Sequence, residues 1–245
     1  MTALQAGVVE VAPGVRRVLA PNPGHMTLDG TNTYVVDAEG GVVVIDPGPL
    51  LEEHLAVVAS HAPVLAAVLT HRHDDHAGGV GRFVELTGAE VFDRATLPED
   101  GAQLGLAGLR VFHTPGHTAD SICLVRDDSG LVFTGDTILG RGTTVVAYPD
   151  GNLTDYLRSL PRIRDLGDLT VLPGHGPVLP SARAVAAQYL HHRETRLDQV
   201  RAALAAGDTT AEQVVERVYA DVDRVLWPAA ELSVRAQLAH LEQAT

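Results

Sequence analysis

The sequence has 245 residues, 45% hydrophobic and 20% charged, which is enough apolar material for one large domain with a small appendage and excludes a mainly disordered chain. Eighteen basic residues, all Arg, stand against 31 acidic ones, and the net charge of −13 excludes binding of polyanions by bulk electrostatics. The single cysteine, Cys123, excludes a disulfide framework and a thiolate-rich metal site.

Strands dominate the start of the chain, and helices then join them. Leu51–Ser60 has helical spacing, the apolar run Val64–Thr70 is typical of a strand buried on both faces, and a further helix reaches about Thr87. A short strand is expected at Glu90–Asp93. The first strands, short and β-branched between Pro, Gly or Asp turns, are predicted at Val8–Val11, Val15–Ala20, Thr33–Asp37 and Val42–Asp46.

The second half repeats this order and then changes character. Its strands are predicted at Leu109–His113, Ser121–Arg126, Leu131–Thr134 and Thr170–Leu172, with a helix at Leu153–Asp165. From Ser181 onward the spacing is helical throughout, with breaks at Asp208–Thr210 and Trp227-Pro228. We therefore expect an α/β domain over residues 1–180 and a small all-α domain over residues 181–245.

Apolar residues at helical spacing in the tail are expected to form core contacts with the body, and Trp227 is interpreted as a buried structural residue. Arg193 and Arg196 are interpreted as an exposed helix face paired with Glu194 and Asp198, and contact with a substrate is the alternative. The residues expected to form these contacts between tail and body are Tyr189, Leu190, Leu197, Val200, Leu204, Val214, Val215, Val218 and Leu226.

Two further features of the sequence concern where in the cell the protein is located. No apolar run reaches the ~18 residues that a membrane span needs, and Met1–Ala20 lacks the apolar core of a signal peptide. We therefore expect a cytoplasmic protein with no membrane partner. The oligomeric state is left open.

The pattern His71-x-His73-x-Asp75-His76 directly follows a predicted buried strand. Side chains at positions i and i+2 of an extended or turning segment converge on one side, so His71 and His73 can bind one ion. Asp75 and His76 follow the turn and can reach a second ion.

Three more predicted strands end in segments of the same kind, each with glycine beside a ligand residue. These segments supply His117, Asp136 and His175. Because four strand ends offer His or Asp, we expect their side chains to converge at one edge of a sheet. Imidazole and carboxylate ligands without thiolate suit Zn²⁺, and Mn²⁺ or Fe²⁺ remain alternatives.

The order HxHxDH, TPGHT, TGD and PGHG over about residues 10–180 resembles the metallo-β-lactamase superfamily. The resemblance implies an αββα sandwich with a two-zinc site at its edge. It also implies that Asp136 bridges the ions and that Asp46 orients a ligand histidine. The implied ligands of the first ion are His71, His73 and His117. Those of the second are Asp75, His76 and His175.

Such a site implies a hydrolase in which a hydroxide bridging the two ions attacks an acyl or phosphoryl centre at neutral pH. Asp75 is the protein group expected to orient that hydroxide or to move a proton. No Ser-His-Asp assignment competes, because the histidines are used as ligands.

Asp136 at the bridging position argues against a true β-lactamase. Three further segments resemble the beta-lactamase-like endoribonuclease family related to the mitochondrial enzyme, which implies a winged-helix-like tail and cleavage of short single-stranded RNA. The residues that this resemblance places near a substrate are Arg141, Thr143 and Tyr148. The segments that carry it are Leu139–Val145, Tyr148–Gly151 and His192–Glu194.

The alternative is a small-molecule hydrolase, either a thioesterase of the hydroxyacylglutathione hydrolase type or a lactonase. A nuclease with net charge −13 needs a local basic groove running from the site to the tail helices. A thioesterase needs a closed apolar pocket capped by those helices. A third hypothesis is a metal-binding domain without catalysis, whose tail binds DNA or protein.

Overall fold

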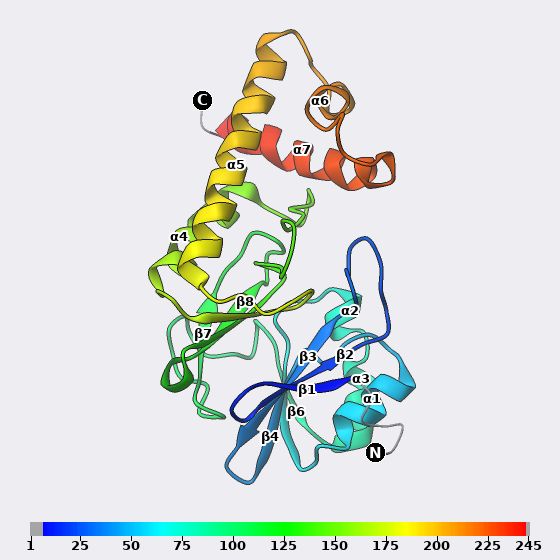
Figure 1. Cartoon of the computed structure of the whole chain (residues 1–245), viewed down its shortest axis with the longest axis vertical. Helices are drawn as coiled ribbons and strands as arrows, with labels where there is room; N and C mark the ends of the chain where they lie inside the picture. Colours follow the sequence, from blue (N-terminus) through cyan, green and yellow to red (C-terminus); the bar gives the residue numbers. More distant parts are fainter. Residues whose placement is uncertain (1–6, 244–245) are drawn as a thin grey trace.

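The computed structural model describes residues 7–243. Two β-sheets pack face to face, helices cover both outer faces, and further helices extend from one end (Figure 1). This is the αββα sandwich with a C-terminal helical region that the sequence predicted, and the prediction of fold class is confirmed.

The first sheet has six strands in chain order. Strands β1 to β4 pair antiparallel, and β4–β5 and β5–β6 pair parallel. Its inner and outer faces are both apolar: along β4, Val43 and Ile45 join the core between the sheets, and Val42 and Val44 face the helices. The strands are β1 (Val8–Ala12), β2 (Val15–Leu19), β3 (Asn32–Ala38), β4 (Gly41–Ile45), β5 (Val64–Val68) and β6 (Glu90–Phe92).

The second sheet has four strands in the order β10-β9-β8-β7, with only the β9–β10 pair parallel. Its inner face meets the first sheet, where the rings of Tyr34 and Phe133 lie edge to face with centroids 5.3 Å apart. The strands are β7 (Leu109–His113), β8 (Ile122–Arg126), β9 (Leu131–Gly135) and β10 (Thr170–Pro173).

Helices close the sandwich on both sides. Helices α1 (Glu52–Ala59) and α3 (Val80–Thr87) cover the first sheet, where Leu55 and Phe83 are fully buried. Helix α4 (Leu153–Asp165) and the first half of α5 (Ala182–Ala205) cover the second sheet. The predicted bounds of α4 agree with the structure at both ends.

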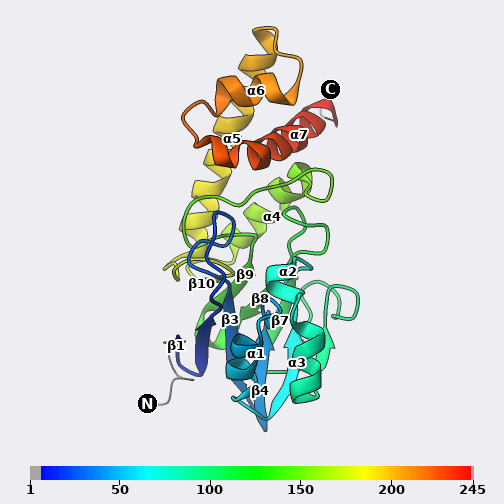
Figure 2. The same cartoon turned by 90° about the vertical axis from the view of Figure 1, so that its right-hand side faces the viewer.

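The tail has a core of its own. Helices α5, α6 (Ala211–Val218) and α7 (Trp227–Gln243) enclose a cluster that includes Val200, Val214 and Val215 (Figure 2). The expectation that these three residues contact the body is therefore wrong, and so is the expectation for Leu204, whose exposed fraction is 37%. The body and tail share α5, and the predicted division at residues 180 and 181 falls just before that helix begins.

Trp227-Pro228, expected as a break, is the first turn of α7, preceded by the 3₁₀ turn Arg224–Leu226. Proline suits a first helical turn, because its missing N–H would have no partner there. Trp227 is half-buried, and its Nε1–H donates to the carbonyl of Val222 at 3.1 Å.

None of the helices between residues 7 and 243 has the length and apolar character needed to cross a bilayer. The prediction for Met1–Ala20 rests in part on residues 1–6, which lie outside the described residues. The cytoplasmic location stays a prediction.

Leu160 in α4 is fully buried between the second sheet and α5. We expect Leu160→Ala to lower the free energy of unfolding by about 2–5 kcal/mol, because it leaves a cavity in this layer. The control Leu86→Ala, at an exposed position of α3, should change it by less than about 0.5 kcal/mol. Urea unfolding measures both, and equal losses would show that the α4 layer lies outside the cooperative core.

Candidate metal centre

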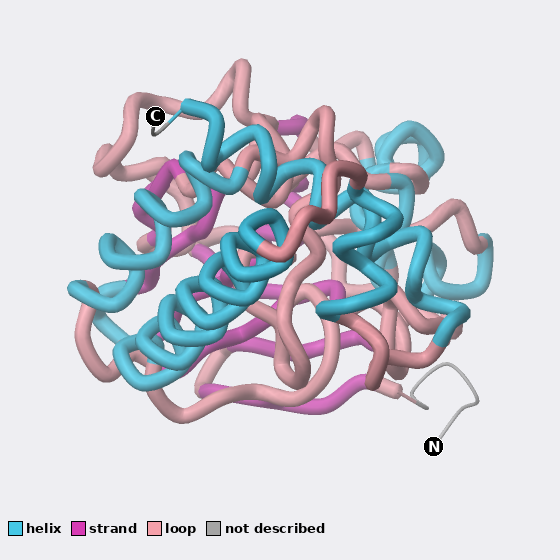
Figure 3. Tube along the Cα trace, turned by 90° about the horizontal axis from the view of Figure 1, so that it is seen from above, coloured by secondary structure: helices cyan, strands magenta, loops and turns pink. Residues whose placement is uncertain are grey.

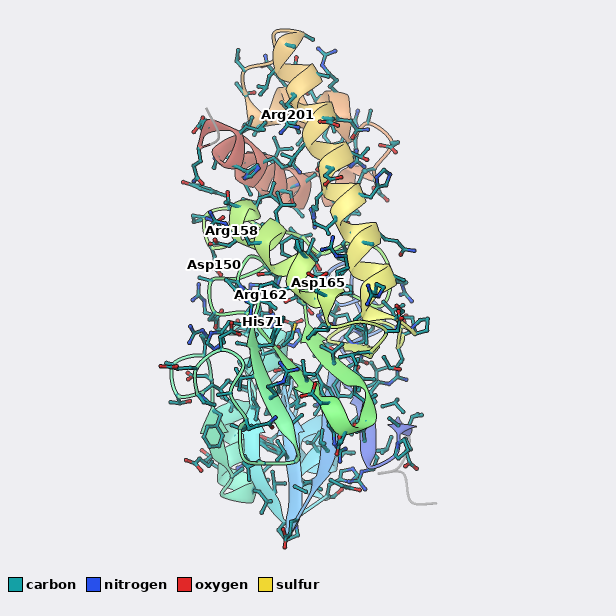
Figure 4. The ribbon with its side chains drawn as sticks, turned by 90° about the vertical axis from the view of Figure 1, so that its left-hand side faces the viewer. His71, Asp150, Arg158, Arg162, Asp165 and Arg201 are labelled. Carbon is teal, nitrogen blue, oxygen red and sulfur yellow. The ribbon has the colours of Figure 1, made fainter. Side chains whose placement is uncertain are left out.

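Four loops that follow strands β5, β7, β9 and β10 meet at the edge of the sandwich nearest the tail helices. The loop after β5 turns into the short helix α2 (Asp74–Ala77), which lies at this edge in Figure 1. Figure 4 shows His71 at the junction between the strands and α4. The structure therefore brings the predicted strand ends together at this edge.

The first cluster contains three imidazoles whose nitrogen atoms face one point. Nε2 of His71 and Nε2 of His117 each lie 3.1 Å from Nδ1 of His73. Three nitrogens, one from each residue, all lie within 4.8 Å of one another. Three converging nitrogens form the kind of donor set that binds a divalent transition metal.

The second cluster joins Asp75, His76 and His175. Nε2 of His175 lies 3.0 Å from Oδ2 of Asp75 and 3.2 Å from Nε2 of His76. Two imidazoles and one carboxylate again suit zinc, manganese or iron. The structure thus groups the predicted ligands into the two sets that the resemblance implied.

Asp136 lies between the two clusters. Its Oδ2 is 3.3 Å from Nε2 of His175 and 3.9 Å from Nε2 of His117, and its Oδ1 is 3.4 Å from Nε2 of His76. Oδ1 is buried and has no hydrogen-bond partner among the described residues. A buried carboxylate oxygen without a partner is costly, and a cation between the clusters would satisfy it. The donor set therefore fits a pair of divalent metal ions.

Several imidazoles are turned toward this centre by hydrogen bonds on their far side. His76 Nδ1–H donates to Oδ2 of Asp46 at 2.8 Å, since a carboxylate can only accept. His117 Nδ1–H donates to the carbonyl of Val145 at 2.8 Å, and His175 Nδ1–H donates to that of Gly30 at 3.1 Å. In each ring Nε2 is therefore the nitrogen that faces the centre and is available to a metal ion.

Asp46, predicted to orient a ligand histidine, contacts His76. Its other contacts are to Thr70, whose backbone N–H and hydroxyl each donate to the carboxylate at 2.7 Å. The residue has φ 51°, a left-handed conformation uncommon outside glycine, so the backbone is strained to present this carboxylate.

Without metal, protons take the place of the ions. Burial opposes a charge on His76, but Asp136 and Asp46 prevail and hold its pKa well above the usual value. The same competition, with hydrogen bonds that His175 donates to Asp136 and Asp75, raises the pKa of His175 to about 9. Burial lowers the pKa of His71 well below its usual value. His76 and His175 therefore carry protons at neutral pH that a metal ion must displace.

Some residues that build the site were not predicted. The Thr144 hydroxyl donates to the backbone carbonyl of Asp136 at 2.7 Å. Buried His54 lies 3.0 Å from the Thr33 hydroxyl and 3.1 Å from the Pro47 carbonyl, beside the turn that carries Asp46. The Gly-Thr-Thr motif pointed to Thr143 rather than Thr144, and no signal in the sequence singles out His54.

A cavity of about 340 Å³ opens beside His117 and Asp136 and extends beneath the tail. Seen from above, helices of the tail lie over the sandwich (Figure 3). The tail forms its far wall through residues of α5 and α7 and the segment between α6 and α7. Its apolar lining residues are Met26, Leu28, Leu139, Val145, Val222, Leu226, Ala229 and Ala230.

Two of the three predicted substrate residues line this cavity. Arg141 does so, but its guanidinium donates to both carboxylate oxygens of Asp29 at 2.8 and 2.9 Å. Thr143 also lines it, with its hydroxyl 3.4 Å from Nε2 of His192. Tyr148 does not line the cavity and is 46% exposed.

The segment that follows Tyr148 also lies to one side. Asp150 of the Tyr-Pro-Asp-Gly motif, labelled in Figure 4, forms an ion pair with Arg72, the residue between His71 and His73. This pair ties the loop to the metal-binding motif rather than to the cavity. The interpretation of Arg193 as an exposed residue is wrong, because only 4% of it is exposed.

Residues 26–97 and 91–175 match the family described as "Metallo-beta-lactamase superfamily", and residues 210–244 match "Beta-lactamase associated winged helix domain". The "Beta-lactamase-like protein 2 homolog" of Drosophila melanogaster is 33% identical, over 98% of this chain and 92% of that protein. The "Atrochrysone carboxyl ACP thioesterase" of Aspergillus chevalieri is 35% identical, over 88% of this chain and 76% of that protein. A solved structure is titled "Crystal structure of TTHA1623 in a di-iron-bound form". It is 29% identical to this chain, covers 68% of this chain and 96% of its own, and superposes with a TM-score of 0.57.

Gly174 leaves room for the metal ligands. A Cβ at this position would lie 2.5 Å from Oδ1 of Asp136 and 2.6 Å from Cε1 of His76, so one ligand would have to move. We expect Gly174→Ala to weaken metal binding by at least about 10-fold. Gly81→Ala, where a Cβ would meet nothing within 4 Å, is the matched control. Elemental analysis after dialysis measures both, and full metal content in Gly174→Ala would contradict this account.

Metal binding should release protons. Because the pKa of His175 is raised to about 9 and that of His76 is also raised, both rings lose a proton when they become ligands at pH 7. We expect release of about two protons per chain, with affinity that falls as the pH is lowered. Calorimetry in buffers of different ionisation enthalpy counts the protons. His175→Gln should release about one fewer, and an unchanged count would show that His175 is neutral before metal binds.

Proposed function

The chain belongs to the metallo-beta-lactamase superfamily, and from this premise we propose that it is a hydrolase of small-molecule thioesters or esters that uses two divalent metal ions, with zinc preferred. The proposed ligands of the first ion are His71, His73 and His117. The proposed ligands of the second ion are Asp75, His76 and His175. Asp136 is proposed to contact both.

The cavity is the observation on which the proposed class of substrate rests. It begins at His117 and Asp136, has an apolar wall that includes Leu139 and Leu226 beside polar and basic side chains, and is bordered by the tail helices. A volume of about 340 Å³ is in the range of sites for small organic ligands. An acyl group placed there would bring its carbonyl carbon to the metal centre and would be shielded from water.

The relatives support the same class of reaction. The Aspergillus protein named as an acyl-carrier-protein thioesterase aligns with 88% of this chain, a span that must include parts of both the sandwich and the tail. The structure titled as a di-iron form supports a two-metal centre, and iron is therefore kept beside zinc and manganese.

Bound divalent ions would supply a hydroxide nucleophile at neutral pH and positive charge for the developing oxyanion. The protein's own contribution is position and proton transfer. Asp75 is the more exposed carboxylate at the centre, with 26% of its side chain accessible against 11% for Asp136, and its pKa is lowered by His175 against the effect of burial. Asp75 is therefore ionised and placed to accept a proton and pass it to solvent.

The endoribonuclease prediction stays a prediction. Arg141, the residue proposed to contact a phosphate, already forms a bidentate pair with Asp29 at the surface. Tyr148 lies outside the cavity. The cavity has the apolar wall expected for a thioesterase, and it also holds Arg193 and Arg196, the basic residues that a nuclease would need, so the substrate assay decides between the two.

A parallel assay tests the proposal. We expect metal-loaded protein to hydrolyse S-lactoylglutathione or an acyl N-acetylcysteamine thioester, and Asp75→Ala to lower kcat by at least about 100-fold. The neighbouring exposed residue provides the control, Asp74→Ala, which should retain activity. Each protein is first brought to known metal content and is also given a fluorescent single-stranded RNA.

Two outcomes would overturn the proposal. Metal-dependent RNA cleavage that is lost in Asp75→Ala, without thioester turnover, would favour the endoribonuclease. Two bound metal ions with neither activity, and a tail that keeps a protein or DNA partner after chelation, would favour a binding module.

A further inference from the structure

Arg193 is a buried cation without a carboxylate partner. Its Nη2–H donates to the carbonyl of Thr144, and its guanidinium lies 5.1 Å from the ring centroid of Tyr156. Its Nε is buried and has no hydrogen-bond partner, and no carboxylate oxygen of the described residues lies within 4 Å of the side chain. Buried charges in proteins are almost always paired, so an unpaired one at a cavity indicates a missing anion.

Arg196 stands nearly one helical turn further along α5 and lines the same cavity. It donates to the carbonyl of Val218 at 2.8 Å and to the side chain of Gln199 at 3.0 Å, and it stacks on Tyr219 at 4.5 Å. Within residues 7–243 it also has no ion-pair partner. Arg141 at the rim differs, because Asp29 neutralises it.

The cavity is therefore electropositive although the protein is strongly acidic. Among the residues that the structure describes, its one acidic lining residue is Asp136, at the candidate metal centre. Burial, with the charges of Arg193 and Arg196, lowers the pKa of His192 to about 4. A neutral acyl chain would leave both guanidinium groups uncompensated in an apolar wall.

We propose that Arg193 and Arg196 bind a carboxylate carried on the acyl group of the substrate, remote from the bond that is cleaved. The inference rests on the proposed thioester or ester hydrolysis and names the substrate class as ω-carboxyacyl compounds. A planar guanidinium donates paired hydrogen bonds to a carboxylate, which fixes the direction of the chain as well as its end.

The placement of Arg193 links this anion site to the metal centre. Thr144 accepts from Arg193 through its carbonyl and donates through its hydroxyl to the backbone of Asp136. The next residue, Val145, holds His117. A carboxylate bound at Arg193 therefore anchors the acyl chain against the same loop that positions two metal ligands.

A matched pair of substrates tests the proposal. Adipoyl N-acetylcysteamine carries a terminal carboxylate, and its monoamide is nearly isosteric and neutral. We expect the wild type to prefer the carboxylate by about 10- to 100-fold in kcat/KM, because a charge-assisted pair is lost with the amide. In Arg193→Met the preference should fall to near one, and Arg193→Lys should restore part of it.

Control variants separate charge recognition from folding. Arg201 lies on the same helix, farther from the sandwich, and pairs with Asp198 at 2.7 Å, so Arg201→Met should leave the preference unchanged (Figure 4). Arg196→Met keeps the proposal testable if Arg193→Met does not fold, and it should reduce the preference at least severalfold. Thermal unfolding of each variant checks the fold.

Three results would overturn the inference. Equal turnover of both thioesters by the wild type would leave the hydrolase standing and remove the anion site. A loss in Arg193→Met confined to hexanoyl-CoA, with hexanoyl N-acetylcysteamine unaffected, would place the anion on the leaving group. If neither thioester is hydrolysed, binding of adipate against adipamic acid decides, and equal affinity in wild type and Arg193→Met would reject the site.

Discussion

The buried negative charge of Asp136 is the constraint on which the edge of the sandwich depends. One of its oxygens has no protein partner, and the other faces imidazoles from two different loops. The surrounding structure accommodates this charge in several ways: Gly174 leaves the space, Thr144 holds the backbone, and Asp46 and main-chain carbonyls turn the rings. Metal binding would compensate the negative charge of the Asp136 carboxylate, which the protein alone buries at a cost in free energy.

The balance of charge changes with depth. The surface is acidic, and most of its arginines are paired with carboxylates, as Arg141 is with Asp29. Beneath the tail the sign reverses, because Arg193 and Arg196 face a cavity whose one acidic lining residue within residues 7–243 is Asp136. Net charge therefore gives no guide to the chemistry of this site, since the field inside a low-dielectric cavity is set by the few groups that line it.

Periodicity predicted most strands and the bounds of α4, because β-branched runs and helical spacing are local properties. The motif at the end of β5 and the three shorter strand-end motifs predicted the ligand clusters, since parallel topology brings strand ends together. Thr144 was not predicted in its role, and Arg193 was interpreted as an exposed residue. The two are joined by a contact between distant segments, since Arg193 lies 49 positions after Thr144, and no local pattern encodes such a contact.

Helix α5 is one uninterrupted element of 24 residues whose first half belongs to the body core and whose second half belongs to the tail core. The number of residues in this helix therefore sets how the tail core is rotated relative to the body core. One residue inserted between Leu197 and Val200 would turn everything beyond it by about 100° and shift the wall formed by Val222 and Leu226 away from the metal centre. The length of this helix is therefore a dimension of the cavity itself.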